Sequence, residues 1–192
     1  MLTELVRKSR SYRRFHENEP LETDKLLGLI ELARLSPSGA NLQPLKYLIA
    51  DSPEINAKIF PCLSWAGYLK DWPGPASGDR PPAYIIILGD QEIAKSFGVD
   101  HGIAAQSIML GAAEQGLGGC IIGSVNRTRL AENLNLKSHL EILLVLAIGR
   151  PKETVVIEPL GNQGDIKYWR DDDDIHRVPK RPLQNLVISL EN

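Results

Sequence analysis

A short basic segment near the N-terminus carries the residue types that bind phosphate. Residues 10–15 read RSYRRF. Arginine presents planar, permanently charged sets of donors that match phosphate geometry, and the Ser11 hydroxyl adds another hydrogen bond beside them. The segment therefore predicts a site for a phosphorylated ligand. An exposed basic turn after a short helix is the alternative.

A second segment, residues 36–44 with the sequence SPSGANLQP, combines a helix stop with hydrogen-bonding side chains. Its small residues permit close approach of the backbone to a ligand. Ser38, Asn41 and Gln43 can bond a polyhydroxyl chain or the edge of a heterocycle. Taken alone, the segment is equally compatible with a surface turn.

The glycines of residues 116–123, GLGGCIIG, do not form a dinucleotide-binding turn. That motif would need glycine at Ile121, and these glycines follow a helix and enter a strand, which is the reverse order. The chain also lacks a P-loop and a Gly-x-Ser-x-Gly elbow. Taken alone, the glycines indicate a helix end.

Composition limits the classes of function. The 192 residues are 43% hydrophobic and 24% charged, with a net charge of −2, which is typical of one globular domain without a nucleic acid partner. The apolar runs are too short to span a membrane, so we expect a cytoplasmic protein. Two cysteines without metal-ligand spacing predict no metal site. The four aspartates of residues 171–174 are expected to form a solvated turn, and none of the four histidines is assigned a role.

Helices and strands are expected to alternate. The apolar patterns predict strands at 46–50, 83–89, 120–123 and 142–149, with helices at the N-terminus and near 23–35, 53–62, 100–113 and 126–136. The Pro- and Gly-rich residues 72–82 form a long loop, and the chain beyond Pro151 is expected to be irregular. This order indicates an α+β or α/β domain of three layers.

Five motifs, taken in order, resemble the nitroreductase family of FMN-dependent oxidoreductases. Besides the three segments above, these are residues 148–151, IGRP, and 179–183, PKRPL. The resemblance implies an α+β, three-layer α/β/α fold with a mixed, mostly antiparallel central sheet flanked by helices. It also implies a single domain over residues 1–192 of a homodimer, in which residues 150–192 are a C-terminal extension that wraps the partner subunit.

The resemblance also implies a role for each site residue. Arg10 and Ser11 would bind the FMN phosphate, with Lys180 or Arg181 closing on it from the C-terminal motif. Arg13 matches the basic residue that reaches the flavin N1 and C2 carbonyl edge, where a cation stabilises the reduced ring.

Two further groups would complete this site. Pro37, Ser38 and Asn41 would come from the partner subunit, because the family's two equivalent sites lie in the dimer interface. The main chain of Ile121, Ile122 and Gly123 would face the flavin N5. One departure is Ser9, which stands where many relatives carry arginine, so phosphate binding must depend more on the remaining basic residues, and the role of Arg14 stays open.

The activity implied is hydride transfer from NADH or NADPH, through flavin N5, to an electron-poor acceptor such as a nitroaromatic or a quinone, with ping-pong kinetics. No catalytic side chain is needed because the cofactor carries the chemistry. The alternatives are an FMN-binding electron-transfer module reduced by a protein such as ferredoxin, and a specialised flavin enzyme of the same fold, such as a dehalogenase. Four residues could form a wall over the flavin or simply pack: Trp65, Tyr68, Leu69 and Trp72.

Overall fold

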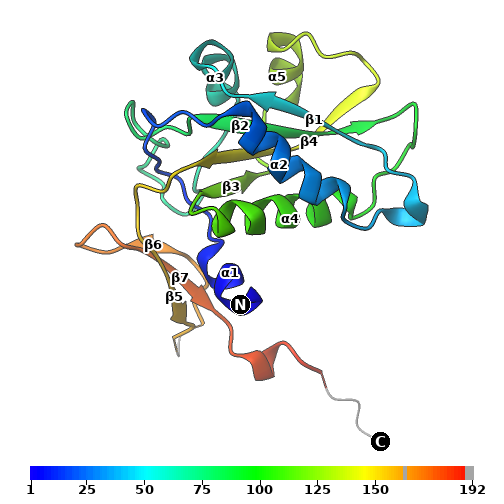
Figure 1. Cartoon of the computed structure of the whole chain (residues 1–192). Coiled ribbons are helices and arrows are strands. Elements are labelled where there is room, and N and C mark those ends of the chain that lie inside the picture. Colours follow the sequence, from blue (N-terminus) through cyan, green and yellow to red (C-terminus); the bar gives the residue numbers. More distant parts are fainter. Residues whose placement is uncertain (162–163, 189–192) are drawn as a thin grey trace, which may run out of the picture.

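An antiparallel sheet of four strands forms the middle of the molecule (Figure 1). In the computed structural model, which describes residues 1–161 and 164–188, the strands lie in the order β1 (Leu45–Ala50), β2 (Ala83–Asp90), β4 (Leu140–Gly149) and β3 (Gly118–Ile122). Every neighbouring pair is antiparallel. β2 is buried along its whole length, as its continuous apolar run predicts.

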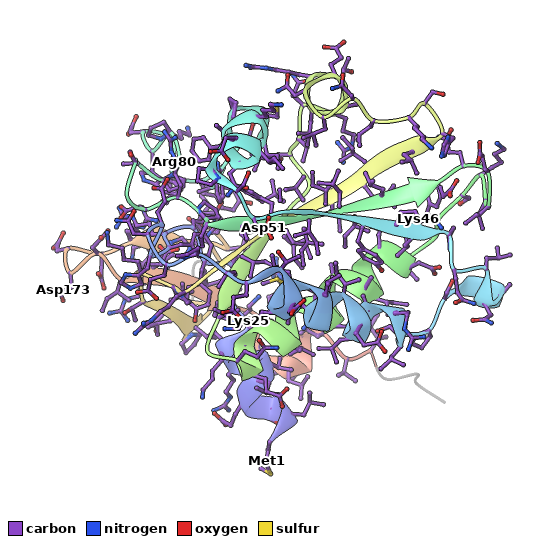
Figure 2. The ribbon with its side chains drawn as sticks, turned by 45° about the horizontal axis from the view of Figure 1, so that its top comes forward. Met1, Lys25, Lys46, Asp51, Arg80 and Asp173 are labelled. Atoms are coloured by element: carbon purple, nitrogen blue, oxygen red, sulfur yellow. The ribbon has the colours of Figure 1, made fainter. Side chains whose placement is uncertain are left out.

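Helices cover both faces of this sheet. α2 (Thr23–Arg34) and α4 (Asp100–Glu114) pack on one face, and α3 (Pro53–Ile59) and α5 (Arg127–Asn133) lie on the other (Figure 1). Each face has its own apolar cluster, and side chains fill the space between the layers (Figure 2). The predicted three-layer α/β/α fold is therefore confirmed.

Close packing of α4 explains its small residues. Ala104, Ile108 and Ala112 lie in the core, so the helix is buried over most of its surface. A Cβ at Gly111 would lie 2.2 Å from a methyl carbon of Leu32 in α2, so glycine allows these two helices to approach each other. This packing fixes α4 beneath β3, where the helix lines part of the site.

The N-terminal segment runs from α1 (Leu2–Lys8) along the free edge of β3. Ser11 forms an isolated parallel bridge with Gly119, and the Tyr12 N–H donates to the Gly119 carbonyl at 2.9 Å. Phe15 is fully buried and anchors the end of the segment. The basic residues are thereby held against the central sheet. Because this bridge is parallel, the strand pairing of the central sheet is mixed.

A second, smaller sheet follows the central one. Its strands are β5 (Val155–Pro159), β6 (Trp169–Arg170) and β7 (His176–Lys180), in the order β5, β7, β6. The prediction that the chain is irregular beyond Pro151 was wrong. The strands are short, β5 and β7 contain proline, and ion pairs of Arg177 with Asp171 and Glu158 link them, so no long apolar pattern reveals them.

Short 3₁₀ turns complete the described chain, at Gly39–Asn41, Phe60–Cys62 and Leu183–Asn185. Within the described residues, no helix combines the length and apolar character that crossing a bilayer requires. The small sheet lies beside α1 of the same chain (Figure 1). The last residues of the predicted C-terminal extension, 189–192, fall outside the described residues, and its crossing to a partner stays a prediction.

Candidate functional site

The small sheet and the basic segment enclose a cavity of about 290 Å³ at the edge of β3. Of the residues predicted to bind cofactor, the structure brings five together here: Arg10, Ser11, Arg13, Ile121 and Lys180. Ser9, the position that departs from the family pattern, lines the same cavity. Three cationic side chains and two serine hydroxyls therefore converge from sequence positions about 170 residues apart, and this donor set suits a phosphate.

Arg10 is held by the helix that precedes it. Its Nη2 donates to the Val6 carbonyl in α1 at 2.7 Å. Its Nε is buried and has no partner within the described chain. A buried guanidinium donor without a partner is costly, so an anionic ligand at this place would satisfy it.

A second cavity, of about 180 Å³, adjoins the first. Both are lined by Arg13, Ile121 and Tyr168, while the second adds Ile122 and Gly123. The two cavities together form an elongated space along β3. The residues predicted to bind phosphate line the first cavity, and Ile122 and Gly123, which are predicted to face the flavin N5, line the second.

Arg13 makes contacts on several sides. Its side chain is 8% exposed, and its guanidinium carbon lies 4.8 Å from the centroid of the Tyr168 ring. Nη1 lies 3.2 Å from the Ser11 carbonyl and 3.1 Å from His176 Nε2. The Glu153 carboxylate accepts hydrogen bonds from the Arg13 and Arg14 backbone N–H groups.

His176 was not assigned a role from the sequence, but it lines the first cavity. It is 1% exposed, and its Nδ1 has no partner among the residues that the structure describes. Burial, together with the Arg13 and Arg170 charges, lowers the pKa of His176 to about 4. The imidazole is therefore neutral at physiological pH. The ring of Tyr168, which the sequence also did not single out, packs against this ring in a tilted arrangement, with 5.1 Å between the ring centroids.

The loop with Pro37, Ser38 and Asn41 lies away from these cavities in the same chain. Pro37 and Ser38 line a separate pocket of about 170 Å³, and Asn41 lines neither cavity. Ser38 Oγ donates to Asp100 in α4 at 2.6 Å, and the Gln43 N–H donates to Ser38 Oγ at 2.9 Å. One chain therefore does not bring this loop to the basic cavity.

The backbone of that loop is strained. Ala40, Asn41 and Gln43 have φ values of 47°, 55° and 52°, in the left-handed region that residues other than glycine rarely adopt. Each such residue costs about 1 kcal/mol or more, and such strain is concentrated at ligand-binding sites. Asp100, which is 7% exposed and also accepts the Gly39 N–H at 3.0 Å, helps to hold the conformation.

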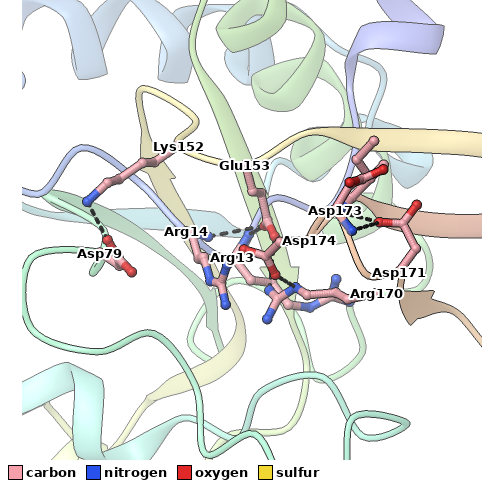
Figure 3. Close-up of polar contacts among 10 residues, drawn as sticks. Arg13, Arg14, Asp79, Lys152, Glu153, Arg170, Asp171, Asp173 and Asp174 are labelled. Atoms are coloured by element: carbon pink, nitrogen blue, oxygen red, sulfur yellow. Dashed lines mark hydrogen bonds and ion pairs between the residues drawn. The ribbon is translucent and has the colours of Figure 1, made fainter.

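Two basic residues near the cavity have other surroundings. Arg181 is exposed and does not line either cavity. Arg14, whose role the sequence left open, forms an ion pair with Asp174 (Figure 3). Its guanidinium carbon also lies 6.0 Å from the Trp72 ring centroid. Lys180 is therefore the cavity's cation from the C-terminal motif.

The acidic residues 171–174 form a turn, as predicted, but they are not simply solvated. Asp171 accepts from Arg177 Nε at 2.7 Å and from the Asp173 and Ile175 backbone N–H groups, and these bonds lower the pKa of its carboxyl. Asp174 pairs with Arg14. The run thus orders the small sheet by ion pairing.

The predicted aromatic wall is divided. Trp65 lines the second cavity, and the Tyr68 ring packs at a tilt against Tyr168, with 5.0 Å between the ring centroids. Leu69 and Trp72 line neither cavity, and the Trp72 ring lies 4.4 Å from the Arg170 guanidinium. Only part of this group can therefore contact a ligand in the elongated space.

Elsewhere, Asp90, Glu92 and His139 bring potential metal-ligand atoms within 4.8 Å of one another. The Lys46 ammonium group lies 4.0 Å from an Asp90 carboxylate oxygen. This positive charge opposes a divalent cation at the same place.

Comparison with known proteins agrees with this architecture. The model of the Nitroreductase family matches residues 6–150, so the chain belongs to that family. The chain is 24% identical to an iodotyrosine deiodinase from Thermotoga neapolitana, with 80% of this chain and 90% of the relative aligned. It is also 24% identical to YdgI of Bacillus subtilis, provisionally named an NAD(P)H nitroreductase, over 77% of this chain and 87% of that protein.

Solved structures share the fold. An FMN-dependent nitroreductase from Clostridium difficile R20291 superposes with a TM-score of 0.67 at 24% identity, covering 98% of each chain. A nitroreductase family protein from Streptococcus pneumoniae TIGR4 gives a TM-score of 0.67 at 18% identity, covering 83% of this chain and 94% of that one. At this identity the likeness establishes the fold alone.

Proposed function

We propose that the protein is an FMN-dependent oxidoreductase that takes hydride from NADH or NADPH and passes electrons to an electron-poor acceptor. One observation carries the proposal: Arg10, Arg13 and Lys180 converge on one cavity that runs along β3. This group of cations, with hydroxyls beside it, suits a ligand that carries both a phosphate and a polarisable ring.

The residues present fit FMN. The buried Arg10 Nε and His176 Nδ1 are donors without protein partners in the described chain, and both residues line the cavity. Arg10, Ser9, Ser11 and Lys180 would hold the phosphate. The Arg13 guanidinium would lie at the ring's N1 and C2 carbonyl edge, and the main chain of Ile121–Gly123 would face its N5.

FMN, when bound, supplies hydride acceptance and donation at N5. The protein's part is to bind, orient and tune it. Arg13 is nearly buried, so its positive charge acts through a medium that screens it less than water does. That charge favours added electron density on a neighbouring ring, which promotes reduction of the ligand.

A homodimer forms part of this proposal. Pro37, Ser38 and Asn41 would reach the partner's site, which would explain why their strained loop lies away from the cavity of its own chain. We also propose a cytoplasmic location, since the nicotinamide donors are cytoplasmic metabolites.

A visible spectrum of the purified protein tests the proposal directly. We expect flavin absorbance, its loss on anaerobic addition of NADH or NADPH, and its return when a quinone or a nitroaromatic is added. Free FMN at equal concentration serves as the control. A protein that stays colourless after reconstitution with FMN contradicts the proposal. Flavin that is bound but stays oxidised under excess nicotinamide would instead support an electron-transfer module reduced by a protein such as ferredoxin.

Reductive dehalogenation is the second candidate, because a relative aligned over 80% of this chain is an iodotyrosine deiodinase. Under this alternative, the acceptor is a halogenated phenol that enters the second cavity, beside the residues that would face the flavin N5. Release of halide from iodotyrosine by the reduced protein would favour it. Rapid turnover of a nitroaromatic without halide release would favour the first candidate.

A further inference from the structure

His176 offers a hydrogen-bond acceptor to Arg13. It is the first residue of β7, and its Nε2 lies 3.1 Å from Arg13 Nη1. A guanidinium only donates hydrogen bonds and stays protonated, so Nε2 must be the accepting nitrogen. His176 is therefore the neutral tautomer that carries its proton on Nδ1.

The acceptors that contact the Arg13 guanidinium are neutral. In the part of the chain that the structure describes, no carboxylate lies within ion-pair distance of its guanidinium. Glu153 bonds the Arg13 backbone instead, and its Oε2 pairs with Arg170 at 3.0 Å. His176 and the Ser11 carbonyl are neutral acceptors, so they orient the guanidinium without cancelling its charge.

The aromatic ring of Tyr168 restricts the pair further. It lies 4.8 Å from the Arg13 guanidinium carbon and 5.1 Å from the His176 ring. All three residues line the first cavity. Arg13 therefore enters the predicted flavin site in one orientation, with histidine as its side-chain acceptor.

We propose that His176 is a positioning residue that aims the Arg13 guanidinium at the flavin ring edge while leaving its positive charge uncompensated. The inference rests on the proposed function. A carboxylate at position 176 would orient Arg13 equally well but would neutralise it. Neutral histidine orients Arg13 and leaves its positive charge in place. That charge raises the flavin's tendency to accept electrons.

The test is the midpoint potential of bound FMN in matched variants at saturating FMN. His176→Leu removes the acceptor, and we expect the potential to fall toward that of Arg13→Ala. His176→Gln places an amide oxygen near the position of Nε2, and we expect it to restore the potential. The double variant Arg13→Ala/His176→Leu should fall no further than Arg13→Ala, because the two residues act as one unit. His139→Gln, outside the cavity, is the histidine control.

A second measurement does not depend on activity or on the variants. Histidine ¹⁵N NMR of the wild-type protein, with and without FMN, should find His176 protonated on Nδ1 only. A proton on Nε2 overturns the inference. It is also overturned if His176→Leu binds FMN at the wild-type potential, or if His176→Gln and His176→Leu shift the potential equally. A wild-type protein that does not bind FMN contradicts the proposed function itself, and the inference fails with it.

Discussion

Glu153 and Arg170 form an ion pair at 3.0 Å in which the two side chains are 1% and 11% exposed (Figure 3). The other Glu153 oxygen accepts from the backbone N–H groups of Arg13 and Arg14. One buried carboxylate therefore connects the basic segment, the end of the central sheet and the small C-terminal sheet. The geometry of the predicted flavin site depends on this connection.

Glu153→Ala should destabilise the protein by about 3–5 kcal/mol, because it leaves two backbone donors unpaired and leaves the nearly buried Arg170 with only its longer ion pair to Asp174, at 3.8 Å. Urea unfolding at fixed protein and FMN concentrations measures the change in the free energy of unfolding. Glu19→Gln is the control, since the Glu19–Arg150 pair is exposed and should contribute less than about 1 kcal/mol. Equal losses in the two variants would contradict the role given to Glu153.

Arg10→Ala and Arg13→Ala should affect FMN differently. Loss of a charged hydrogen bond to phosphate should weaken FMN binding about 10- to 100-fold in Arg10→Ala. Arg13→Ala should chiefly lower the midpoint potential of the bound flavin. Fluorescence titration measures the affinity, and Arg7→Ala, an exposed arginine in α1, is the control. Equal losses of affinity with no change in potential would refute the separate roles.

Stability should fall with acid through His176. Its pKa is about 4 when folded and about 6.5 when unfolded, so the unfolded chain binds more protons between these values. The contribution of neutral His176 to the free energy of unfolding is intact above pH 6.5. It is lost as the pH falls toward 4, for a total of about 3 kcal/mol. Urea unfolding from pH 7 to pH 4 measures it. His176→Gln should show a shallower slope, and identical slopes would show that His176 does not titrate in this way.

Gly119→Ala should weaken both folding and FMN binding. A Cβ at this position would lie 2.3 Å from the Ala147 carbonyl oxygen and 2.8 Å from Met109 Cε, so β3 must shift. The Ser11 bridge to Gly119 would shift with it. Gly28→Ala is a matched control in α2, where the added methyl meets nothing within 4 Å and should stabilise the protein by about 1 kcal/mol. FMN affinity and the free energy of unfolding in urea are measured for both variants. Losses in Gly119→Ala that are no larger than those in Gly28→Ala would contradict the prediction.

The sequence predicts the central fold well because that fold depends on local apolar patterns. The run at 83–89 is long and apolar enough to identify β2, and the periodicity near 23–35 identifies α2. Charged motifs in the order of a known family then identify the basic segment. These features are visible within single stretches of sequence.

The small sheet and its contacts are not visible in that way. β5 and β7 are five residues each and carry charged residues, and β6 has only two residues. His176 is 163 residues from Arg13, and Glu153 is 140 residues from it. Long-range polar pairs leave no periodic pattern, so histidine and tyrosine in this region could not be assigned to the site from sequence.

Mixing two variants with weakened FMN binding would test whether the site is shared between subunits. Arg10→Ala removes a residue of the basic cavity, and Asn41→Ala changes the strained loop. If the loop acts on the partner's site, each homodimer is impaired in both sites. A mixed dimer, however, has one site that combines wild-type Arg10 with wild-type Asn41.

We therefore expect that unfolding and refolding the two variants together restores FMN binding, to about one intact site in each mixed dimer. Variants that are refolded separately and mixed afterwards, under conditions without subunit exchange, are the control and should stay impaired. If the loop instead serves its own chain, every site in the mixed dimer lacks one of the two residues. Refolding together would then restore nothing, and the split site would be ruled out.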